Sequence, residues 1–322
     1  MMAQVPGAEL LSVPDIGLPR LAVAVEARKL PFRYHESWIT PLTSTGLPTA
    51  SSMPSTQDAV ALLERASTPI VFRALPEGHP TTDALLAAAT HHHFLNRWQR
   101  AALHVTGSYD DWLMQNFDHK RRKELKRLRA RLSEQGTLVV SHLQPGGDLG
   151  PFIKAFLDLE AKGWKGKRGT AIENDPRLVK GLEQGLAGLH RSGNVRFWMM
   201  QLDGKPIAAL FALIDGEEAT LGKIAHDETW AKFSPGVQII LEATEALFAE
   251  EGVSLADSNA IPDHPMINRI WRDRITCVDV VLAGPSVTAA SFNGLTRFLG
   301  MKHATRSLLK RTFLRLTGRK QS

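Results

Sequence analysis

The sequence of 322 residues has a single cysteine, Cys277, and no apolar run that approaches the roughly 20 residues of a membrane-spanning helix. One cysteine excludes an internal disulfide and a thiolate cluster, and its apolar neighbours favour a buried structural role over a nucleophilic one. The N-terminus lacks the basic-then-apolar pattern of a secretory signal. With 43% hydrophobic residues, the sequence predicts a globular, cytoplasmic protein.

The sequence also lacks a pattern typical of metal ligands. His91, His92 and His93 are adjacent in sequence, and adjacent side chains do not easily converge on one ion. No acidic residue or histidine follows them at helical spacing. We therefore expect no metal site.

The net charge of +6 is concentrated in two segments. Residues 119–131 hold eight Lys or Arg and one Glu, and residues 302–322 hold seven Lys or Arg and no acidic residue. Such local positive charge attracts phosphates, nucleic acids or anionic membranes, although a solvated helix face gives the same pattern. Because no zinc-ligand, RNP or helix-turn-helix signature accompanies residues 119–131, we do not expect a nucleic-acid partner.

The C-terminal basic segment separates Leu308, Leu309 and Phe313 from its charged residues at helical spacing. An amphipathic basic helix of this kind can lie on an anionic surface, here the inner face of the membrane. The same pattern is also found in helices that pack on their own protein or on a second subunit. The sequence leaves these alternatives open, and it does not indicate an oligomeric state.

The periodicity of apolar residues predicts an α/β protein of the α+β type, with a mixed and mainly antiparallel sheet flanked by helices. Before residue 109 the predicted elements are a strand at 21–27, a helix at 56–66, a strand at 68–75 and a helix at 81–93. After residue 109 the predicted order is a basic helix, a strand, two helices, three antiparallel strands joined first by a tight Asp203-Gly204 turn, the helix 237–251 and two further strands.

Ser234, Pro235 and Gly236 stand directly before the predicted helix 237–251. A helix N-terminus exposes unpaired backbone N–H groups and carries about half a positive charge, which suits a bound phosphate. Gly236 lets a ligand approach the backbone, Pro235 restricts the turn, and Ser234 can cap the helix or bind a phosphate oxygen. The same residues are also an ordinary helix start signal.

Five segments in this order resemble the GNAT acyltransferases, most closely their cellulose-biosynthesis (CelD-like) branch, which is related to the FemAB-type transferases. The segments are "SYDDWLMQNFDHKRRKELKRLRARLSEQG" at 108–136, "LEAKGWKGKRGT" at 159–170, "LDGKPIAALFAL" at 202–213, "AHDETWAKFSPGVQIILEA" at 225–243 and "GVSLADS" at 252–258.

The resemblance implies the domain organisation and the reaction. It implies a flexible arm at 1–20, a degenerate GNAT-like domain at 21–108, the acyltransferase domain at 109–285 and a basic helical extension at 286–322. Acetyl-CoA, or another acyl-CoA, would donate its acyl group by direct attack in a ternary complex. The acceptor would be an amine or hydroxyl of a small molecule or glycan precursor in envelope or polysaccharide metabolism.

The resemblance also implies where the acyl-CoA lies. Its thioester would meet backbone N–H groups in the third strand of the meander, and its pyrophosphate would meet the turn and the first amides of the helix. The residues expected to bind the cofactor are Lys223, Ile224, Ala225, Phe233, Ser234, Pro235, Gly236, Val237 and Gln238.

Three residues are candidates for proton transfer, because they follow the strands that would border the thioester: His226, Asp227 and Asp257. Asp227 could equally cap the following turn, and His226 could be a structural histidine. The residues expected to bind the acceptor are Trp164, Lys165, Asp263 and His264, of which Trp164 could equally belong to the core.

The sequence departs from the family pattern at three places. Phe233 and His226 stand where the family has tyrosine, and the segment 261–274 lacks the lysine that the family carries there. No role of those groups can be transferred to this chain. Two alternatives remain: a FemAB-like transferase that uses aminoacyl-tRNA, and a non-catalytic protein that binds acyl-CoA or nucleic acid.

Overall fold

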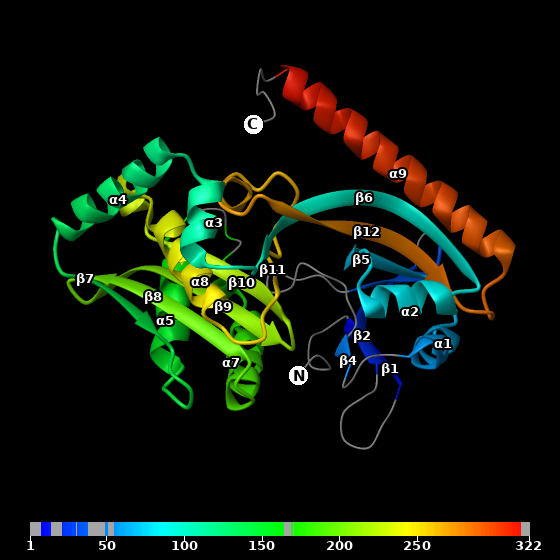
Figure 1. The fold of residues 1–322 in the computed structure, drawn as a ribbon. Helices are drawn as coiled ribbons and strands as arrows, with labels where there is room; N and C mark the ends of the chain where they lie inside the picture. Colours follow the sequence, from blue (N-terminus) through cyan, green and yellow to red (C-terminus); the bar gives the residue numbers. More distant parts are fainter. Residues whose placement is uncertain are drawn as a thin grey trace. The chain divides into compact units, whose positions relative to one another are not determined.

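The computed structural model describes residues 8–13, 21–29, 31–37, 49–50, 55–163, 169 and 171–316. The chain forms two compact units (Figure 1). The central unit is Arg100–Arg274, and the split unit combines Met2–Gln99 with Ile275–Ser322. Strands β6 (His91–His104) and β12 (Asp273–Ala283) each have residues in both units. The domain limits expected at residues 109 and 285 stay a prediction.

The sheet of the central unit has the strand order β6-β11-β10-β9-β8-β7, and all neighbours are antiparallel except β10 and β11. Asp203 and Gly204 have φ of 49° and 73° and form the predicted tight turn between β8 and β9. The strands are β7 Leu138–His142, β8 Val195–Leu202, β9 Lys205–Asp215, β10 Glu218–His226 and β11 Leu255–Asp257.

The helices of the central unit follow the predicted order, but the first predicted helix is two helices. Asp118 breaks it, because its side chain accepts a hydrogen bond from the Arg121 N–H and so begins a new helix. The helices are α3 Tyr109–Asn116, α4 His119–Ser133, α5 Gly150–Lys162, α7 Pro176–Arg191 and α8 Pro235–Phe248, with 3₁₀ helices η2 Ile172–Asn174, η3 Glu228–Phe233 and η4 Ile267–Arg269.

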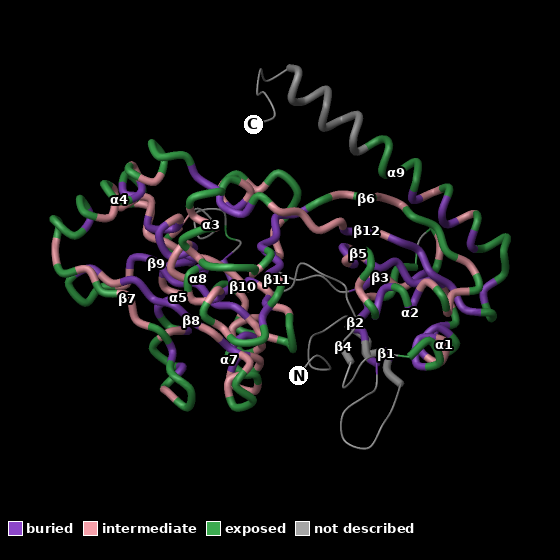
Figure 2. Tube along the Cα trace, viewed as in Figure 1, coloured by how far each residue is buried: buried purple, intermediate pink, exposed green. Residues whose placement is uncertain are grey.

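The two faces of this sheet are covered by different helices, as the two-residue period of strands requires. Phe197 of β8 and Phe211 of β9 contact Phe156 of α5 on one face. Trp198 and Leu210, their neighbours along the strands, belong to the cluster that contains α8. Figure 2 shows buried residues on β8, β9 and α8, whereas α4 carries mainly exposed and intermediate residues.

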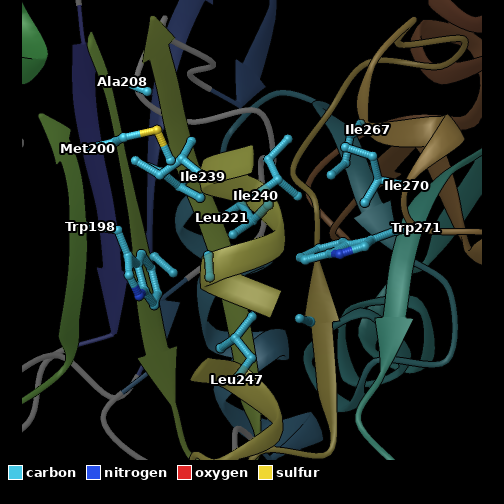
Figure 3. Packing of buried hydrophobic residues seen from close by; sticks show 14 of the residues in the cluster. Trp198, Met200, Ala208, Leu221, Ile239, Ile240, Leu247, Ile267, Ile270 and Trp271 are labelled. Atoms are coloured by element: carbon cyan, nitrogen blue, oxygen red, sulfur yellow. The ribbon is translucent and has the colours of Figure 1, made fainter. Parts of the chain in front are cut away.

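Helix α8 lies between the sheet and the segment 267–271 (Figure 3). Its Ile239 and Ile240 are buried, and side chains of this size contribute roughly 1.5–3 kcal/mol each when they leave water. On the far side, the buried Trp271 donates its indole N–H to Thr244 Oγ1 at 3.0 Å. These contacts hold the N-terminal turn of α8 at a defined place beside β10.

The split unit has the strand order β1-β2-β3-β5-β12-β6, with β4 paired to β2 and with β3 and β5 parallel. Helices α1 and α2 cover the face that carries Phe72 and Val280, and α9 covers the face that carries Val71 and Val281. The remaining elements are β1 Ala8–Val13, β2 Leu21–Arg28, β3 Tyr34–Ser37, β4 Thr49–Ala50, α1 Thr56–Arg65, β5 Ile70–Pro76, α2 Pro80–Ala88 and α9 Ala289–Leu316.

The mixed, mainly antiparallel sheet flanked by helices confirms the predicted fold class. Two local expectations are corrected. Ala8–Val13, expected in a flexible arm, pairs with β2 and buries Leu11. The helix predicted to reach residue 93 ends at Ala88, and His91–His93 begin β6 instead. The expected basic C-terminal helix is α9, although the side chains of residues 306–322 lie outside the described residues.

Candidate functional site

The edge of β10 opens toward β11 near the middle of the strand. The two strands pair in parallel over Glu218–Thr220 and Leu255–Asp257 only, whereas β10 continues to His226. The pairing with β11 therefore stops at Thr220, and among the described residues Ile224, Ala225 and His226 have no strand partner on this side. A free strand edge offers a row of N–H and C=O groups to an extended ligand.

A β-bulge lies at the start of this open edge. The pairing of β10 with β9 shifts register between Leu221 and Ile224. Gly222 lies inside the bulge, where a Cβ would stand 1.9 Å from the Phe211 ring. A bulge changes the direction of the strand that follows it. At this position only a glycine leaves room for the Phe211 ring.

The turn that follows β10 ends in a strained residue. Ser234 precedes α8 with φ 54° and ψ 51°, a left-handed conformation that is uncommon for residues other than glycine. Its side chain makes no capping hydrogen bond to α8. The Ser234 hydroxyl at the helix N-terminus is therefore available to a ligand.

The first backbone N–H groups of α8 differ in whether they have a hydrogen-bond acceptor. The N–H groups of Val237 and Gln238 both donate to the Ser234 carbonyl oxygen, at 3.0 and 3.1 Å. Pro235 has no N–H, and within the described residues the Gly236 N–H has no acceptor. Of the three donors expected from the sequence, Gly236 is thus the one left free, in the positive field of the helix terminus.

The imidazole of His226 lies on this same helix N-terminus. A Cβ on Gly236 would stand 3.1 Å from His226 Nδ1 and 3.3 Å from the Met266 sulfur, so the ring packs directly on the glycine. Burial lowers the pKa of His226 below its ordinary value, although Glu228 and Asp227 act in the opposite direction. The ring is therefore neutral near pH 7 and able to accept a proton.

Asp227 occupies the position of a cap. Its carboxylate accepts hydrogen bonds from the Thr229 N–H at 2.8 Å and the Thr229 hydroxyl at 2.7 Å, which begins η3. The alternative of a turn cap, left open by the sequence, is therefore the one seen in the geometry. A catalytic role for this carboxylate stays a prediction.

Asp257, at the end of β11, is paired with a buried arginine. Arg100 of β6 is fully buried and donates from Nη2 to Asp257 Oδ2, while Oδ1 accepts the Asn259 N–H at 2.8 Å. Burial raises the pKa of Asp257, and the Arg100 guanidinium acts against this rise. Within the described residues, Nε and Nη1 of Arg100 have no hydrogen-bond acceptor. The ion pair occupies Oδ2 of Asp257, and a catalytic role for this carboxylate stays a prediction.

The residues expected to bind the acceptor are only partly placed. Trp164 and Lys165 lie outside the described residues. Asp263 is exposed and has φ 58°. The ring Nδ1 of His264 lies 3.3 Å from the backbone N–H groups of both Met266 and Ile267, a position that caps the turn leading into η4. A role for Asp263 and His264 in binding the acceptor stays a prediction.

The cofactor residues predicted from the resemblance divide into backbone and core positions. Lys223, Ile224 and Ala225 lie in β10 beyond its pairing with β11, and their role in binding acyl-CoA stays a prediction. The ring of Phe233 is buried and stacks on Trp230 with ring centroids 6.0 Å apart, and its role in binding the cofactor stays a prediction.

The basic helix α4 packs beside the start of α8. It contacts η3, and Arg129 forms an ion pair with Glu242 of α8 at 2.8 Å and donates to Gln238 at 3.4 Å. Gln238 in turn donates from Nε2 to the Phe233 carbonyl at 2.7 Å. The helix that carries the eight basic residues therefore lies next to the free amide of Gly236.

Sequence reasoning did not single out Arg100, Gly222 or Met266. Arg100 lies in a strand that was not predicted, and its partner is 157 positions away. Gly222 has a local signal, since a glycine inside a strand pattern indicates a bulge or a close approach. No local pattern indicates Met266.

The described residues contain no group of three His, Cys, Asp or Glu side chains that could hold a metal ion. Among these residues, no helix combines the length and apolar character needed to cross a membrane.

Comparison with known families supports the fold and the class of reaction. Residues 119–261 match the family described as acetyltransferase (GNAT) domain. This range contains α4, the open edge of β10, the strained turn and the start of α8. No curated protein matched the sequence.

Solved structures match both units of the chain. The C-terminal domain (DUF2156) of a protein named as a lysylphosphatidylglycerol synthetase from Agrobacterium fabrum has a TM-score of 0.55 and 8% identity, over 92% of this chain and 90% of that one. L-PGS from Bacillus licheniformis has a TM-score of 0.51 and 9% identity, over 91% and 90%. FemX has a TM-score of 0.49 and 12% identity, over 85% and 87%.

At these identities, the likeness of the first two structures shows the fold alone. The family match over residues 119–261 supports acyl transfer as the class of reaction. Residues 119–261 of this chain are therefore similar to the acetyltransferase (GNAT) domain family.

Proposed function

We propose that the central unit transfers an acyl group, in the first place acetyl, from acyl-CoA to an amine or hydroxyl. The observation that carries this proposal is the open edge of β10, which leads directly to the free Gly236 amide at the start of α8. An extended arm with amide groups can pair with such an edge, and a pyrophosphate suits the helix terminus. CoA has both groups in this order, because its pantetheine arm carries amide groups and is joined to a pyrophosphate.

In this arrangement the backbone of β10 binds the arm and polarises the thioester. Ile224 and Ala225 present their main chain at the unpaired edge, and Lys223 directly precedes them. A backbone N–H aimed at the thioester oxygen would stabilise the negative charge that develops when the acceptor attacks. The bulge at Gly222 sets the direction of these groups.

The phosphates would be held at the turn and by α4. The Ser234 hydroxyl, the Gly236 N–H and the helix dipole supply neutral donors and partial positive charge. Helix α4, placed alongside by the Arg129–Glu242 ion pair, supplies lysines and arginines. This role explains the concentration of charge at 119–131 without a nucleic acid.

We assign the role of general base to His226. Its ring is held neutral by burial and lies between the open edge and the helix terminus. The acceptor nitrogen or oxygen would attack the thioester carbon, the C–S bond would break, and the acceptor proton would pass to the imidazole. The departing CoA thiolate would then take a proton. Asp227 and Asp257 would act as structural partners of this site.

The acceptor is the least constrained part of the proposal. We propose a small molecule or glycan precursor in envelope or polysaccharide metabolism, on the resemblance of the "HDETWAKFSPG" segment to the CelD-like branch. His226 and Phe233 replace the tyrosines of that branch, so its acceptor preference is not transferred.

The exposed basic face of α4 favours one second candidate, transfer from aminoacyl-tRNA. In that case the basic helix would bind the RNA donor directly. The salt dependence of tRNA binding would then be steep, since each neutralised phosphate releases counterions.

Calorimetry with acetyl-CoA, CoA and 3′-dephospho-CoA tests the proposal, with bulk tRNA titrated in parallel. We expect acetyl-CoA and CoA to bind, 3′-dephospho-CoA to bind more weakly, and thiol release when amine and hydroxyl acceptors are screened. Absence of CoA binding at millimolar concentration would remove the acyl-CoA proposal. Tight, salt-dependent tRNA binding in its place would establish the second candidate.

A further inference from the structure

The split unit contains a cavity of about 720 Å³ that the proposed acyl transfer does not use. Its walls come from strands β2, β3, β5, β6 and β12 and from helix α9. The volume lies in the range of small-molecule sites, about 300–1,000 Å³. The cavity is therefore large enough for a ligand.

The sheet face under α9 changes from apolar to charged along its length. On β5 the apolar residue is Val71, and two positions further Arg73 lines the cavity. On β12 Val281 is apolar and Asp279, two positions away on the same face, is charged. Phe292, Leu295 and Leu299 of α9 are buried in the cluster that contains Val71 and Val281. The face under α9 thus carries an apolar cluster and, beside it, an arginine and a carboxylate.

The charged residues that line the cavity on β3, β5 and β12 are joined by a network of hydrogen bonds. Arg73 donates from Nε to Glu36 at 2.8 Å and from Nη1 to Asp279 at 3.2 Å. The other oxygen of Asp279 accepts the N–H of Ala74 at 2.9 Å. Ala74 has φ 53°, and β12 shifts register between Val278 and Val280, so both strands are distorted around this carboxylate. Backbone strain of this kind persists where the surroundings fix it, and it is concentrated at functional sites.

The network leaves an excess of positive charge in the cavity. The lining has four Lys or Arg side chains and two carboxylates, which gives two positive charges more than negative ones. Both carboxylates already bind Arg73, and Glu36 also pairs with Arg28 at 3.3 Å. Within the described residues, Lys29 and Lys302 have no carboxylate partner. Two free ammonium groups at one cavity suit an anion of charge near −2.

From this arrangement we propose that the cavity of the split unit binds a phosphate-bearing ligand through Lys29 and Lys302. A phosphate alone would fill only part of the space. Tyr34, Leu95 and Leu299 line the rest, so the ligand carries an apolar or neutral body next to its phosphate. A lipid with a phosphate headgroup and a soluble phosphate ester both have this chemistry.

Three probes separate these sources in calorimetry: dihexanoyl phosphatidic acid below its micellar concentration, sn-glycerol 3-phosphate, and dihexanoylglycerol, which has no phosphate. We expect saturable binding of phosphatidic acid and none of dihexanoylglycerol. Equal affinity for glycerol phosphate identifies a soluble phosphate ester as the ligand class. Affinity at least tenfold lower for glycerol phosphate identifies a lipid headgroup.

The variant that tests the assignment is Lys29→Gln with Lys302→Gln, and its matched control is Arg65→Gln with Arg297→Gln. All four side chains are exposed in the same unit, and Arg65 and Arg297 do not line the cavity. We expect at least tenfold weaker binding of phosphatidic acid by the first pair and less than twofold change in the control. Acetyl-CoA binding should be unaffected in both.

Three results would overturn the assignment. They are no saturable binding of either phosphate probe, binding of dihexanoylglycerol as tight as that of phosphatidic acid, and equal loss of affinity in the two double variants. Each can be obtained whether or not the central unit binds acyl-CoA.

Discussion

The imidazole of His226 packs on the Cα of Gly236, so that a Cβ at this glycine would stand 3.1 Å from Nδ1. The contact joins the end of β10 to the first turn of α8, and it places the proposed base on the proposed phosphate site. Its geometry leads to the first predictions.

Gly236→Ala should weaken acetyl-CoA binding about tenfold or more. The added methyl must displace His226 or Met266, and it also covers the free amide. Overpacking of this kind costs about 1–3 kcal/mol, partly offset by the higher helix propensity of alanine. Calorimetry and urea unfolding measure the two effects.

Gly181→Ala is the matched control, because Gly181 lies in α7 with no atom near its would-be Cβ. This variant should gain about 0.5–1 kcal/mol in free energy of unfolding and leave acetyl-CoA binding unchanged. Native affinity in Gly236→Ala would show that the phosphate does not bind at this turn.

His226→Gln should lower kcat by about 100-fold or more and leave the Kd for acetyl-CoA within about threefold, since a general base contributes to chemistry rather than to binding. Because the pKa of His226 is lowered from 6.5, the native rate should fall only when the pH drops below about 6.5. Rate measurements from pH 5 to 8 should show that this fall in rate at acidic pH is absent in the variant. If the variant shows the same fall, a residue other than His226 is the general base.

The same histidine should make stability depend on pH. A group whose pKa is lower in the folded state binds fewer protons there than in the unfolded chain, so folding stability is lost as the pH falls from about 6.5 through the folded pKa. Urea unfolding at pH 7.5 and 5.5 should show a smaller loss in His226→Gln than in the native protein. If the native protein and the variant lose equal stability, titrating groups other than His226 govern the pH dependence of stability in this range.

Asp257→Asn should destabilise the central unit by about 3–5 kcal/mol. The substitution leaves the fully buried Arg100 guanidinium without a carboxylate, and an uncompensated buried charge is costly. Asp215→Asn, at an exposed position, should change stability by less than about 0.5 kcal/mol. A small loss in Asp257→Asn, comparable with the control, would mean that the ion pair is not important for folding.

Gly222→Ala should destabilise the protein by about 1–3 kcal/mol, because the new Cβ would lie 1.9 Å from the Phe211 ring. Combining it with Phe211→Leu removes the ring atoms that clash. The double variant should therefore be more stable than the sum of the two single effects predicts, as measured in a double-mutant cycle. Strict additivity would argue against the contact.

The regular elements of residues 109–283 could be predicted because their signals are local. The Asp203-Gly204 turn, the alternation in 195–202 and the helix start at Ser234 each depend on a few neighbouring residues. In contrast, β6 was missed, since His91–His93 continue a helical pattern and only pairing with distant strands makes them a strand.

The roles of the candidate residues could be predicted only in part. The cap formed by Asp227 involves Thr229, two positions away, and was one of the alternatives that the sequence allowed. The pairing of Asp257 with Arg100 and the contact of His226 with Gly236 depend on tertiary structure. Sequence reasoning therefore predicted a place for the site, while side-chain packing decides which of the groups there remain free to react.

The division of the split unit into two segments has a consequence for biosynthesis. The central unit is complete once Arg274 has left the ribosome, whereas the split unit still waits for most of β12 and all of α9. Until then β5, which carries Val71 and Phe72 on its two faces, is paired with β3 but lacks its other neighbour, β12. The nascent chain thus exposes an unfinished sheet while the central unit folds, which makes the first hundred residues the part most dependent on protection during synthesis.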